Sequence, residues 1–454
     1  MNGRSSSAPA VARGIVPRAI FCAVLRAALL TALSTARMTV LPTLLLSVLL
    51  TASAQSDNAA RGVAGAYSLR ARGVEAPAWN PATLAWSPAL DLRIAAVDGG
   101  AHNNAFSLGD YRRWNGAALD EQDQEAILAR IPGSSLRGGF TAAAEGPSAA
   151  WRGWALTASG CAAGSAAVPK EFGRLVFYGN DPEQSFDLGG TRGEGTAWSE
   201  FRLSHGHALG TTQIGGRPVA VVGGFTLKWI RGWAHAKVTR AEGSLVTNTD
   251  GITGAEELTE RSAAGGNGYA CDLGVAAQTG GWRLGLTLTN PASHLSWTRR
   301  PEEHTQRAWV DSLALDDLED DEDTDLVSTD DTTRAIASFS TTLPAEVAVA
   351  AAHRWRGFDW EADLRQGFST HPGTSTTPRL ALGMSRRPWR FFEGRAGLAL
   401  GGADGPVLAL GAGFAAWKLR CDLGIATTRG INFTSPRGVE AGVSLGLSWA
   451  ESGD

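Results

Sequence analysis

Four charged residues recur at every second position in the second half of the chain: Asp359, Glu361, Asp363 and Arg365. Residues two apart on a β-strand share one face, so the three carboxylates could serve as an acid/base group. The arginine on the same face balances their charge, and catalysis would also need a cleft, which sequence does not reveal. The pattern is therefore more typical of a charge-balanced wall than of an active site.

The residues between these charges are apolar. Phe358, Trp360, Leu364 and Phe368 share the opposite face, and a second charged row, Lys418, Arg420 and Asp422, alternates with Trp417, Leu419 and Cys421 in the same way. In water such an apolar face would be buried in a core, whereas a closed barrel in a bilayer turns it outward and keeps charges in the lumen. We predict the barrel, with Asp359, Glu361, Asp363, Arg365, Lys418, Arg420 and Asp422 facing the lumen.

Two further groups could hold a metal ion. His205 and His207 are two residues apart, but a histidine pair without a third ligand is more often solvated. Eight carboxylates between Asp316 and Asp325 could attract calcium, although the run lacks the glycine and spaced glutamate of an EF-hand loop. The motifs H-E-x-x-H, C-x-x-C and G-x-x-x-x-G-K are absent. We predict a non-enzyme without a cofactor or metal site; calcium binding by the acidic run stays open.

Composition and the N-terminal region indicate export. The net charge of −4, with 19% charged residues, gives no basic field for nucleic acid. Arg13, Arg18, Arg26 and Arg37 precede an apolar run from Val40 to Leu50, and Ala52-Ser53-Ala54 fits a cleavage site. We predict a cleaved leader over 1–54, with translation starting at Met1 or Met38. The 16 tryptophans suit a protein anchored at membrane interfaces.

Beyond residue 54 no run of about 18 uncharged apolar residues remains, so a membrane-embedded mature chain must cross as strands. Alternating segments start at Leu90 and dominate from Leu136, with a hairpin corner at Arg356-Gly357. We predict an all-β fold: a closed antiparallel transmembrane β-barrel of about 14 strands (range 12–16) over 89–454. A plug-like segment over 55–88, one small helix over 120–130, and long polar loops near 242–268 and 300–333 complete the prediction.

The segment from Ala76 to Ala85 contains Asn80-Pro81-Ala82 and precedes the first strand. Pro81 lacks a backbone donor and Asn80 can bond neighbouring backbone, which indicates a rigid turn. In this position the tripeptide resembles the N-P-A motif of the FadL superfamily of outer-membrane barrels, which includes PorV-type proteins. The segment from Thr434 to Trp449 is similar to the closing hairpin of such barrels. The resemblance implies that Asn80, Pro81 and Ala82 belong to a plug inside the barrel.

Three functions remain open from the sequence. The first is a bacterial outer-membrane barrel that binds or passes a hydrophobic small molecule. The second is a barrel of the same shape that docks a secretion or surface-attachment partner, and the third is a secreted soluble all-β protein. Expected partners of the barrel are outer-membrane lipid and the barrel-assembly machinery, with no nucleic acid. A lateral opening and an apolar pocket would favour transport, whereas a sealed, charged lumen would favour docking.

Overall fold

A computed structural model describes residues 57–179, 184–187, 189–248, 251–313, 328–431, 433 and 435–449. The predicted leader over 1–54 and the acidic run over 316–325 lie outside the described residues. None of the helices in the described part of the chain is both long and apolar enough to cross a membrane.

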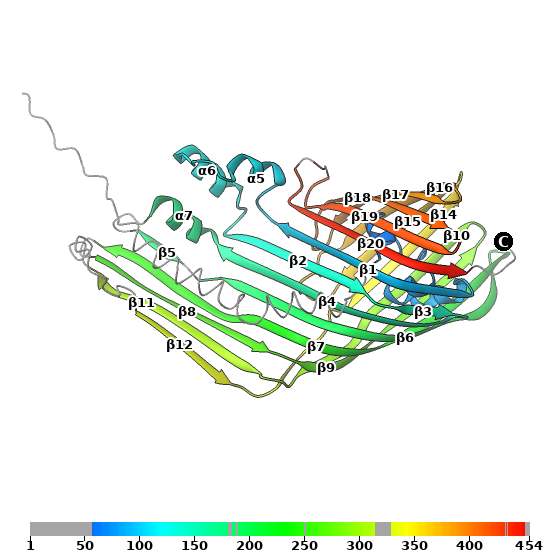
Figure 1. Ribbon diagram of the computed structural model, residues 1–454, viewed down its shortest axis with the longest axis horizontal. Helices are drawn as coiled ribbons and strands as arrows, with labels where there is room; N and C mark the ends of the chain where they lie inside the picture. The colour runs from blue at the N-terminus through cyan, green and yellow to red at the C-terminus, as the bar shows by residue number, and fades with distance from the viewer. Residues whose placement is uncertain are drawn as a thin grey trace, which may run out of the picture.

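Fourteen strand positions in the described residues close into one antiparallel ring (Figure 1). Their order is β1 (Leu90–Asn103), β2 (Ser135–Glu145) continued by β3 (Ser148–Trp151), β4 (Trp154–Pro169), β6 (Arg192–Ile214), β7 (Arg217–Asn248), β9 (Gly266–Thr279), β10 (Trp282–Trp297), β14 (Glu346–Trp355), β15 (Phe358–Gly367), β16 (Arg379–Trp389), β17 (Phe392–Gly401), β18 (Val407–Ala416), β19 (Leu419–Thr428) and β20 (Gly438–Trp449). The last strand closes on the first, from Leu90 opposite Trp449 to His102 opposite Gly438. The predicted closed barrel of about 14 strands is confirmed.

The two ends of the barrel differ in their connections. Six hairpins, β3–β4, β6–β7, β9–β10, β14–β15, β16–β17 and β18–β19, turn within a few residues at one end, which we call the short-turn end. At the β14–β15 corner both central residues have positive φ, +52° at Arg356 and +78° at Gly357, as a type I′ turn requires. The C-terminal end of β20 lies at this end of the molecule (Figure 1).

Three helices lie at the opposite, long-loop end: α5 (Leu108–Trp114), α6 (Glu121–Arg130) and α7 (Lys170–Tyr178) (Figure 1). The helix predicted over 120–130 is confirmed as α6, with Asp120 as its N-cap. The prediction of a single helix missed the other two. α5 has seven residues and depends on a capping box between Ser107 and Asp110, and α7 carries the apolar run Leu175–Tyr178, which resembles a strand.

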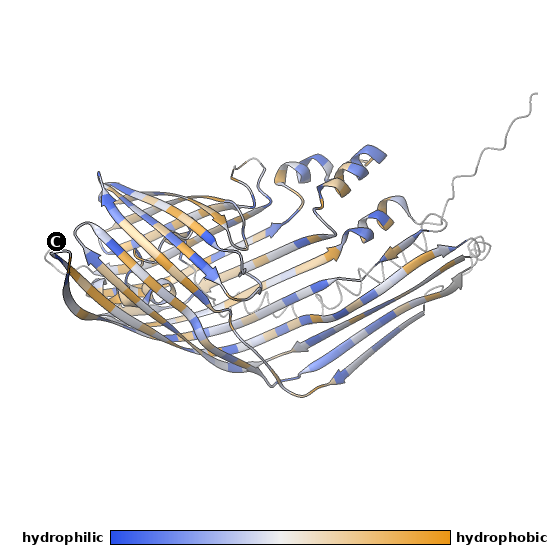
Figure 2. Cartoon of the chain, turned by 180° about the vertical axis from the view of Figure 1, so that it is seen from behind, coloured by the Kyte–Doolittle hydropathy of each residue, from blue (hydrophilic) through white to orange (hydrophobic). Residues whose placement is uncertain are grey.

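A sheet projects past the barrel wall at the long-loop end (Figure 1). It is built on the outer part of β7, which is 32 residues long, and contains β5 (Ser185–Asp187), β8 (Gly251–Ala263), β11 (Glu302–Leu313) and β12 (Ser328–Ala335). The prediction of long polar loops near 242–268 and 300–333 is therefore wrong, because the described parts of both segments are largely strand. Polar residues occupy both faces of β12, where every residue is exposed, so no apolar alternation marks it in the sequence (Figure 2).

Apolar and charged residues alternate between the outside and the inside of the ring (Figure 2). On β15, Trp360 and Leu364 are 42% and 49% exposed, whereas Glu361 and Asp363 are 3% and 0% exposed. The apolar row thus faces outward and the acidic row faces the interior of the barrel.

Short β13 (Phe339–Thr341) precedes β14 and pairs with β10.

Leu364→Arg should destabilise the barrel by about 2–4 kcal/mol, the cost of a cation on the lipid face near the bilayer midplane. The measurement is the fraction folded in detergent, followed by the heat-modifiable shift in gel mobility. Thr329→Arg, on the exposed strand β12, is the control and should leave folding unchanged. Normal assembly of Leu364→Arg would contradict a lipid-facing position.

Candidate functional site: a plug and the chamber above it

The residues before β1 fill the barrel interior at the short-turn end and are called the plug (57–88) (Figure 1, blue). The plug folds as four short helical pieces: α3 (Asn58–Arg61), η2 (Gly73–Glu75), α4 (Ala76–Trp79) and η3 (Pro81–Trp86). Proline stands in the first turn of both α4 and η3, where its missing N–H costs nothing. Most plug side chains are buried, including Ala59, Val63 and Leu69.

Asn80, Pro81 and Ala82 lie at the junction between α4 and η3. The Asn80 side chain accepts a hydrogen bond from the Ala82 backbone N–H at 3.0 Å, which caps η3. Its amide nitrogen donates to the Val275 carbonyl on β9 at 3.3 Å. The motif therefore fastens the plug to the barrel wall as well as turning the chain.

Rows of glycine line the wall where the plug comes closest. Gly206, Gly224 and Gly274 are cross-strand neighbours, and a Cβ on any of them would overlap Asn80, Pro81 or the backbone next to them. A second set meets the plug between Asn58 and Val63: Gly383, Gly397, Gly411, Gly424 and Gly442. These residues form the plug seat. Sequence reasoning missed them, although glycine at lumen-facing strand positions was a visible signal.

Two of the predicted charged residues on β15 bind the plug backbone. Asp363 accepts hydrogen bonds from Ser68, through its N–H at 3.2 Å and its hydroxyl at 2.5 Å. Glu361 accepts from the Leu69 N–H at 2.6 Å. The half-buried Arg365 guanidinium lies 4.3 Å from the centre of the Trp79 ring. The acidic row on this strand therefore supplies acceptors to the plug chain.

A buried ion network joins the plug to both sides of the ring closure. Glu75 of the plug pairs with Arg93 on β1 at 3.1 Å and with Arg420 on β19 at 2.9 Å. Arg420 also pairs with Asp422 at 2.7 Å. Arg93 pairs in addition with Asp57 at 3.2 Å and with Glu145 at 3.9 Å.

The other two predicted charges lie near the short-turn end. Asp359 is half-buried and stands opposite Arg354 in the β14–β15 ladder. The Lys418 ammonium lies 4.8 Å from the Trp417 ring and 5.0 Å from the Trp449 ring, at the β18–β19 turn. Lys418 does not lie on the expected lumen-facing side of a strand, because the chain reverses at Trp417, where φ is +56°.

Release of the plug should increase as the pH rises. Burial, followed by the nearby Glu75 carboxylate, raises the pKa of Asp57 well above its ordinary range, although Arg93 opposes this shift. A carboxyl whose pKa is raised in the seated plug stabilises that state at low pH, and the contribution is lost as the pH rises through the raised pKa. The measurement is protease access to the plug across a pH series. Asp57→Asn should remove the dependence on this group; an unchanged profile in that variant would contradict the assignment.

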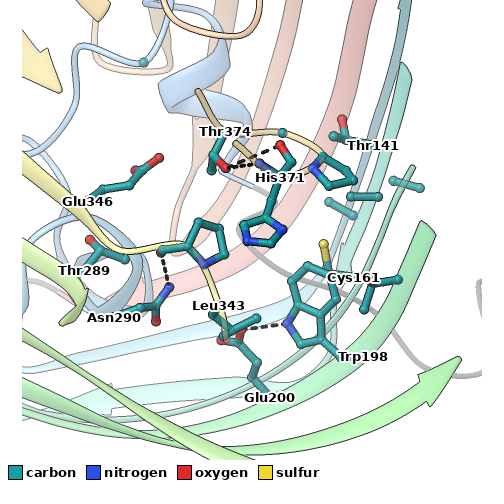
Figure 3. A pocket seen from close by; sticks show the side chains of 18 of the residues that line it. Thr141, Cys161, Trp198, Glu200, Thr289, Asn290, Leu343, Glu346, His371 and Thr374 are labelled. Atoms are coloured by element: carbon teal, nitrogen blue, oxygen red, sulfur yellow. Dashed lines mark hydrogen bonds between the residues drawn. The ribbon is translucent and has the colours of Figure 1, made fainter. Parts of the chain in front are cut away.

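A cavity of about 400 Å³ lies above the plug, on its long-loop side, and is called the chamber (Figure 3). The plug contributes Ala60, Ala64 and Trp79 to its lining. Charged wall residues are paired with one another: Arg202 with Glu200 at 2.8 Å, and Lys228 with Asp272 at 2.8 Å. The charges around the chamber are therefore largely compensated.

The connection between β15 and β16 (368–378) crosses the chamber. His371 projects into the cavity near Trp198 (Figure 3), and its Nδ1 lies 3.3 Å from the Glu194 carboxylate on β6. Glu194 also pairs with Lys237 at 3.1 Å. This connection partly closes the chamber toward the long-loop end.

A second cavity, of about 320 Å³, lies in the wall beside the chamber. Its lining takes consecutive residues from four neighbouring strands: 138–140, 163–166, 194–197 and 234–236. Because consecutive strand residues point to opposite faces, both faces of the wall contribute. Most of these residues are glycine or alanine, and four, Ala163, Glu194, Thr196 and His235, also line the chamber. We call this region the thin wall.

The remaining candidates for metal binding or catalysis are two histidines and one serine motif, and all of them lie on strands. His205 stacks on Trp154 with ring centres 4.2 Å apart, and His207 lies beside it at 6.0 Å. In the described residues, no group of three or more His, Cys, Asp or Glu side chains could hold a metal ion. Residues Gly442–Gly446 match G-x-S-x-G, but they lie inside strand β20, whereas a nucleophile elbow requires a turn between a strand and a helix.

Comparison with known sequences assigns no activity. Residues 81–259 match the sequence model of a family described as a family of unknown function (DUF5723). No curated protein matches the chain.

Several solved outer-membrane barrels are similar in fold. The toluene transporter TodX of Pseudomonas putida is 11% identical, with a TM-score of 0.41 over 88% of this chain and 95% of that one. The monoaromatic hydrocarbon channel CymD is 12% identical, with a TM-score of 0.46 over 89% and 99%. A FadL homologue of Pseudomonas aeruginosa is 13% identical, with a TM-score of 0.40 over 88% and 98%. These likenesses identify no ligand for this chain.

Proposed function

We propose that this chain is a bacterial outer-membrane channel for a small, largely apolar molecule, with the plug closing the axial route. The closed ring and its outward apolar faces support this, because a closed barrel leaves no unpaired strand edge in a bilayer. Short turns lie on the periplasmic side of such barrels and long connections on the outer side. The short-turn end of this chain would therefore face the periplasm.

The observation that carries the proposal is the lining shared by the chamber and the thin wall. The plug fills the lumen below the chamber, so the wall at Ala163 and Thr196 offers a short way from the chamber to the surrounding lipid. The register shift at Ala197–Trp198 between β6 and β7 adds an irregularity to the same region.

The two linings indicate the chemistry of the ligand. Most residues of the thin wall are Gly or Ala, and Phe140 adds an aromatic ring, which suits an apolar body. The chamber presents Thr196, His371 and charged residues, which suit one polar group. An apolar molecule with a single hydrogen-bonding group matches both better than a plain hydrocarbon does.

Ala163→Trp tests this route. The indole would fill space shared by both cavities, so uptake of small aromatic alcohols into vesicles that contain the purified chain should fall about tenfold or more. Ala362→Trp, between Trp360 and Leu364 on the outward face of β15, adds the same bulk far from the route and should leave uptake unchanged. Equal uptake by the Ala163→Trp variant would overturn the lateral route.

A docking role is the second candidate, and the projecting sheet favours it. β7, β8, β11 and β12 extend a polar, exposed surface beyond the barrel. Deletion of 300–333 removes β11 and most of β12 but none of the fourteen ring positions, so the barrel should still fold. If wild-type vesicles take up no small molecule, and this deletion abolishes attachment of a surface partner in cells, docking is the better assignment.

A further inference from the structure

A set of cations, called here the basic rim, gathers on the hairpins of the short-turn end. Lys418 in this set is half-buried. The other members are exposed: Arg152, Arg217, Arg354, Arg356, Arg386, Arg387 and Arg390. They come from five of the six hairpins at that end. Arg152, Arg217, Arg356 and Arg390 make no ion pair within the described part of the chain.

Apart from the pair between Arg387 and Glu393, no ion pair within the described hairpins offsets these cations. Among the described residues of the six hairpins, the nearest carboxylates are Asp359 and Glu393, and both are half-buried. Glu393 is occupied by Arg70 at 3.1 Å, Arg395 at 3.1 Å and Arg387 at 2.8 Å. The chain as a whole carries −4, so the described hairpins of this end are locally positive on a mildly acidic protein.

Exposed aromatic rings accompany the cations. Six tryptophans at this end are exposed, Trp151, Trp154, Trp282, Trp355, Trp389 and Trp417, the last at 89%. The Arg356 guanidinium lies 4.6 Å from the Trp355 ring centre. Tryptophan concentrates at the level of lipid headgroups, so the cations beside these rings are held at the same depth.

We propose that the basic rim binds the phosphates of anionic phospholipids in the leaflet that faces the short turns. Arginine matches a phosphate with two parallel hydrogen bonds, and each cation near an anionic membrane surface strengthens binding by about fivefold. A free inorganic phosphate would gain nothing from the ring of exposed tryptophan, whereas a headgroup attached to acyl chains contacts both. The inference depends on the bilayer placement proposed above and is independent of transport.

The test uses the full chain reconstituted in vesicles of phosphatidylcholine and phosphatidylglycerol, with bromine on the acyl chains of one lipid at a time. Bromine quenches nearby tryptophan, so brominated phosphatidylglycerol should quench at several-fold lower mole fraction than brominated phosphatidylcholine. The triple variant Arg152→Gln, Arg356→Gln, Arg390→Gln should bring the two curves together. The matched triple Arg112→Gln, Arg192→Gln, Arg300→Gln, at the long-loop end, should leave the difference intact.

Each outcome separates this inference from the function proposed above. Absence of quenching by either lipid would remove the bilayer placement and both proposals with it. Equal quenching by the two lipids in the wild type overturns the headgroup inference alone, whether or not the variants fold. Loss of the preference on addition of inorganic phosphate would show that a free anion occupies the rim, which also overturns it.

Discussion

Arg93→Met is expected to destabilise the seated plug by about 3–5 kcal/mol, the cost of leaving buried charges without their partner. Arg93 is buried and faces three carboxylates, Asp57, Glu75 and Glu145, which are buried as well. Methionine fills a similar volume but supplies no charge. The change should appear as a lower midpoint of thermal unfolding and as protease cleavage within the plug.

Arg387→Met is the matched control for this prediction. Arg387 also pairs with a glutamate, at 2.8 Å, but its side chain is 64% exposed. Exposed pairs contribute only about 0–1 kcal/mol, so the control should behave like the wild type. Similar losses in both variants would mean that the network around Arg93 has no special role in holding the plug.

Gly224→Leu should unseat the plug without disrupting the ring of paired strands. A Cβ at this position would overlap the backbone of Pro81 and Ala82, and neither a rotamer change nor a small shift relieves a clash with backbone. The plug must then leave its seat, so single-channel recordings should change from a closed pore to a large, persistent conductance. The heat-modifiable gel shift should persist, because Gly224 keeps its ladder partners on β6 and β9.

Gly394→Leu controls for the substitution itself. A Cβ at Gly394 meets only the Phe392 ring, at 3.7 Å, which is ordinary contact. This variant should remain closed to ions. A closed pore in Gly224→Leu as well would show that the plug tolerates displacement from the glycine row.

The barrel itself could be predicted from sequence because its wall separates two environments. The alternation of Trp360 and Leu364 with Glu361 and Asp363 is strong, since one face points out of the barrel and the other supplies hydrogen-bond acceptors to the plug chain. The corner at Arg356-Gly357 was equally clear, since its turn requires positive φ. Wherever an apolar side and a polar side were both required, the pattern was readable.

Features without that contrast could not be predicted. Strand β12 is exposed on both faces, so its alternation carries no hydropathy signal. The contact of His371 with Glu194 joins residues 177 positions apart, which no local pattern encodes. The plug-seat glycines resembled ordinary small strand residues until the plug backbone was located opposite them. The N-P-A resemblance indicated a plug but not which wall receives it.

Strand β7 has a mechanical consequence, because one continuous strand serves three regions. Its Gly224 supports Pro81, its residues 234–236 line the thin wall, and its outer part carries the projecting sheet. A mechanical load on the sheet tip would therefore be transmitted along a single polypeptide to both the thin wall and the plug. In the proposed orientation, contact at the cell surface would act on the lateral route and on the plug together, with no relay through intervening loops.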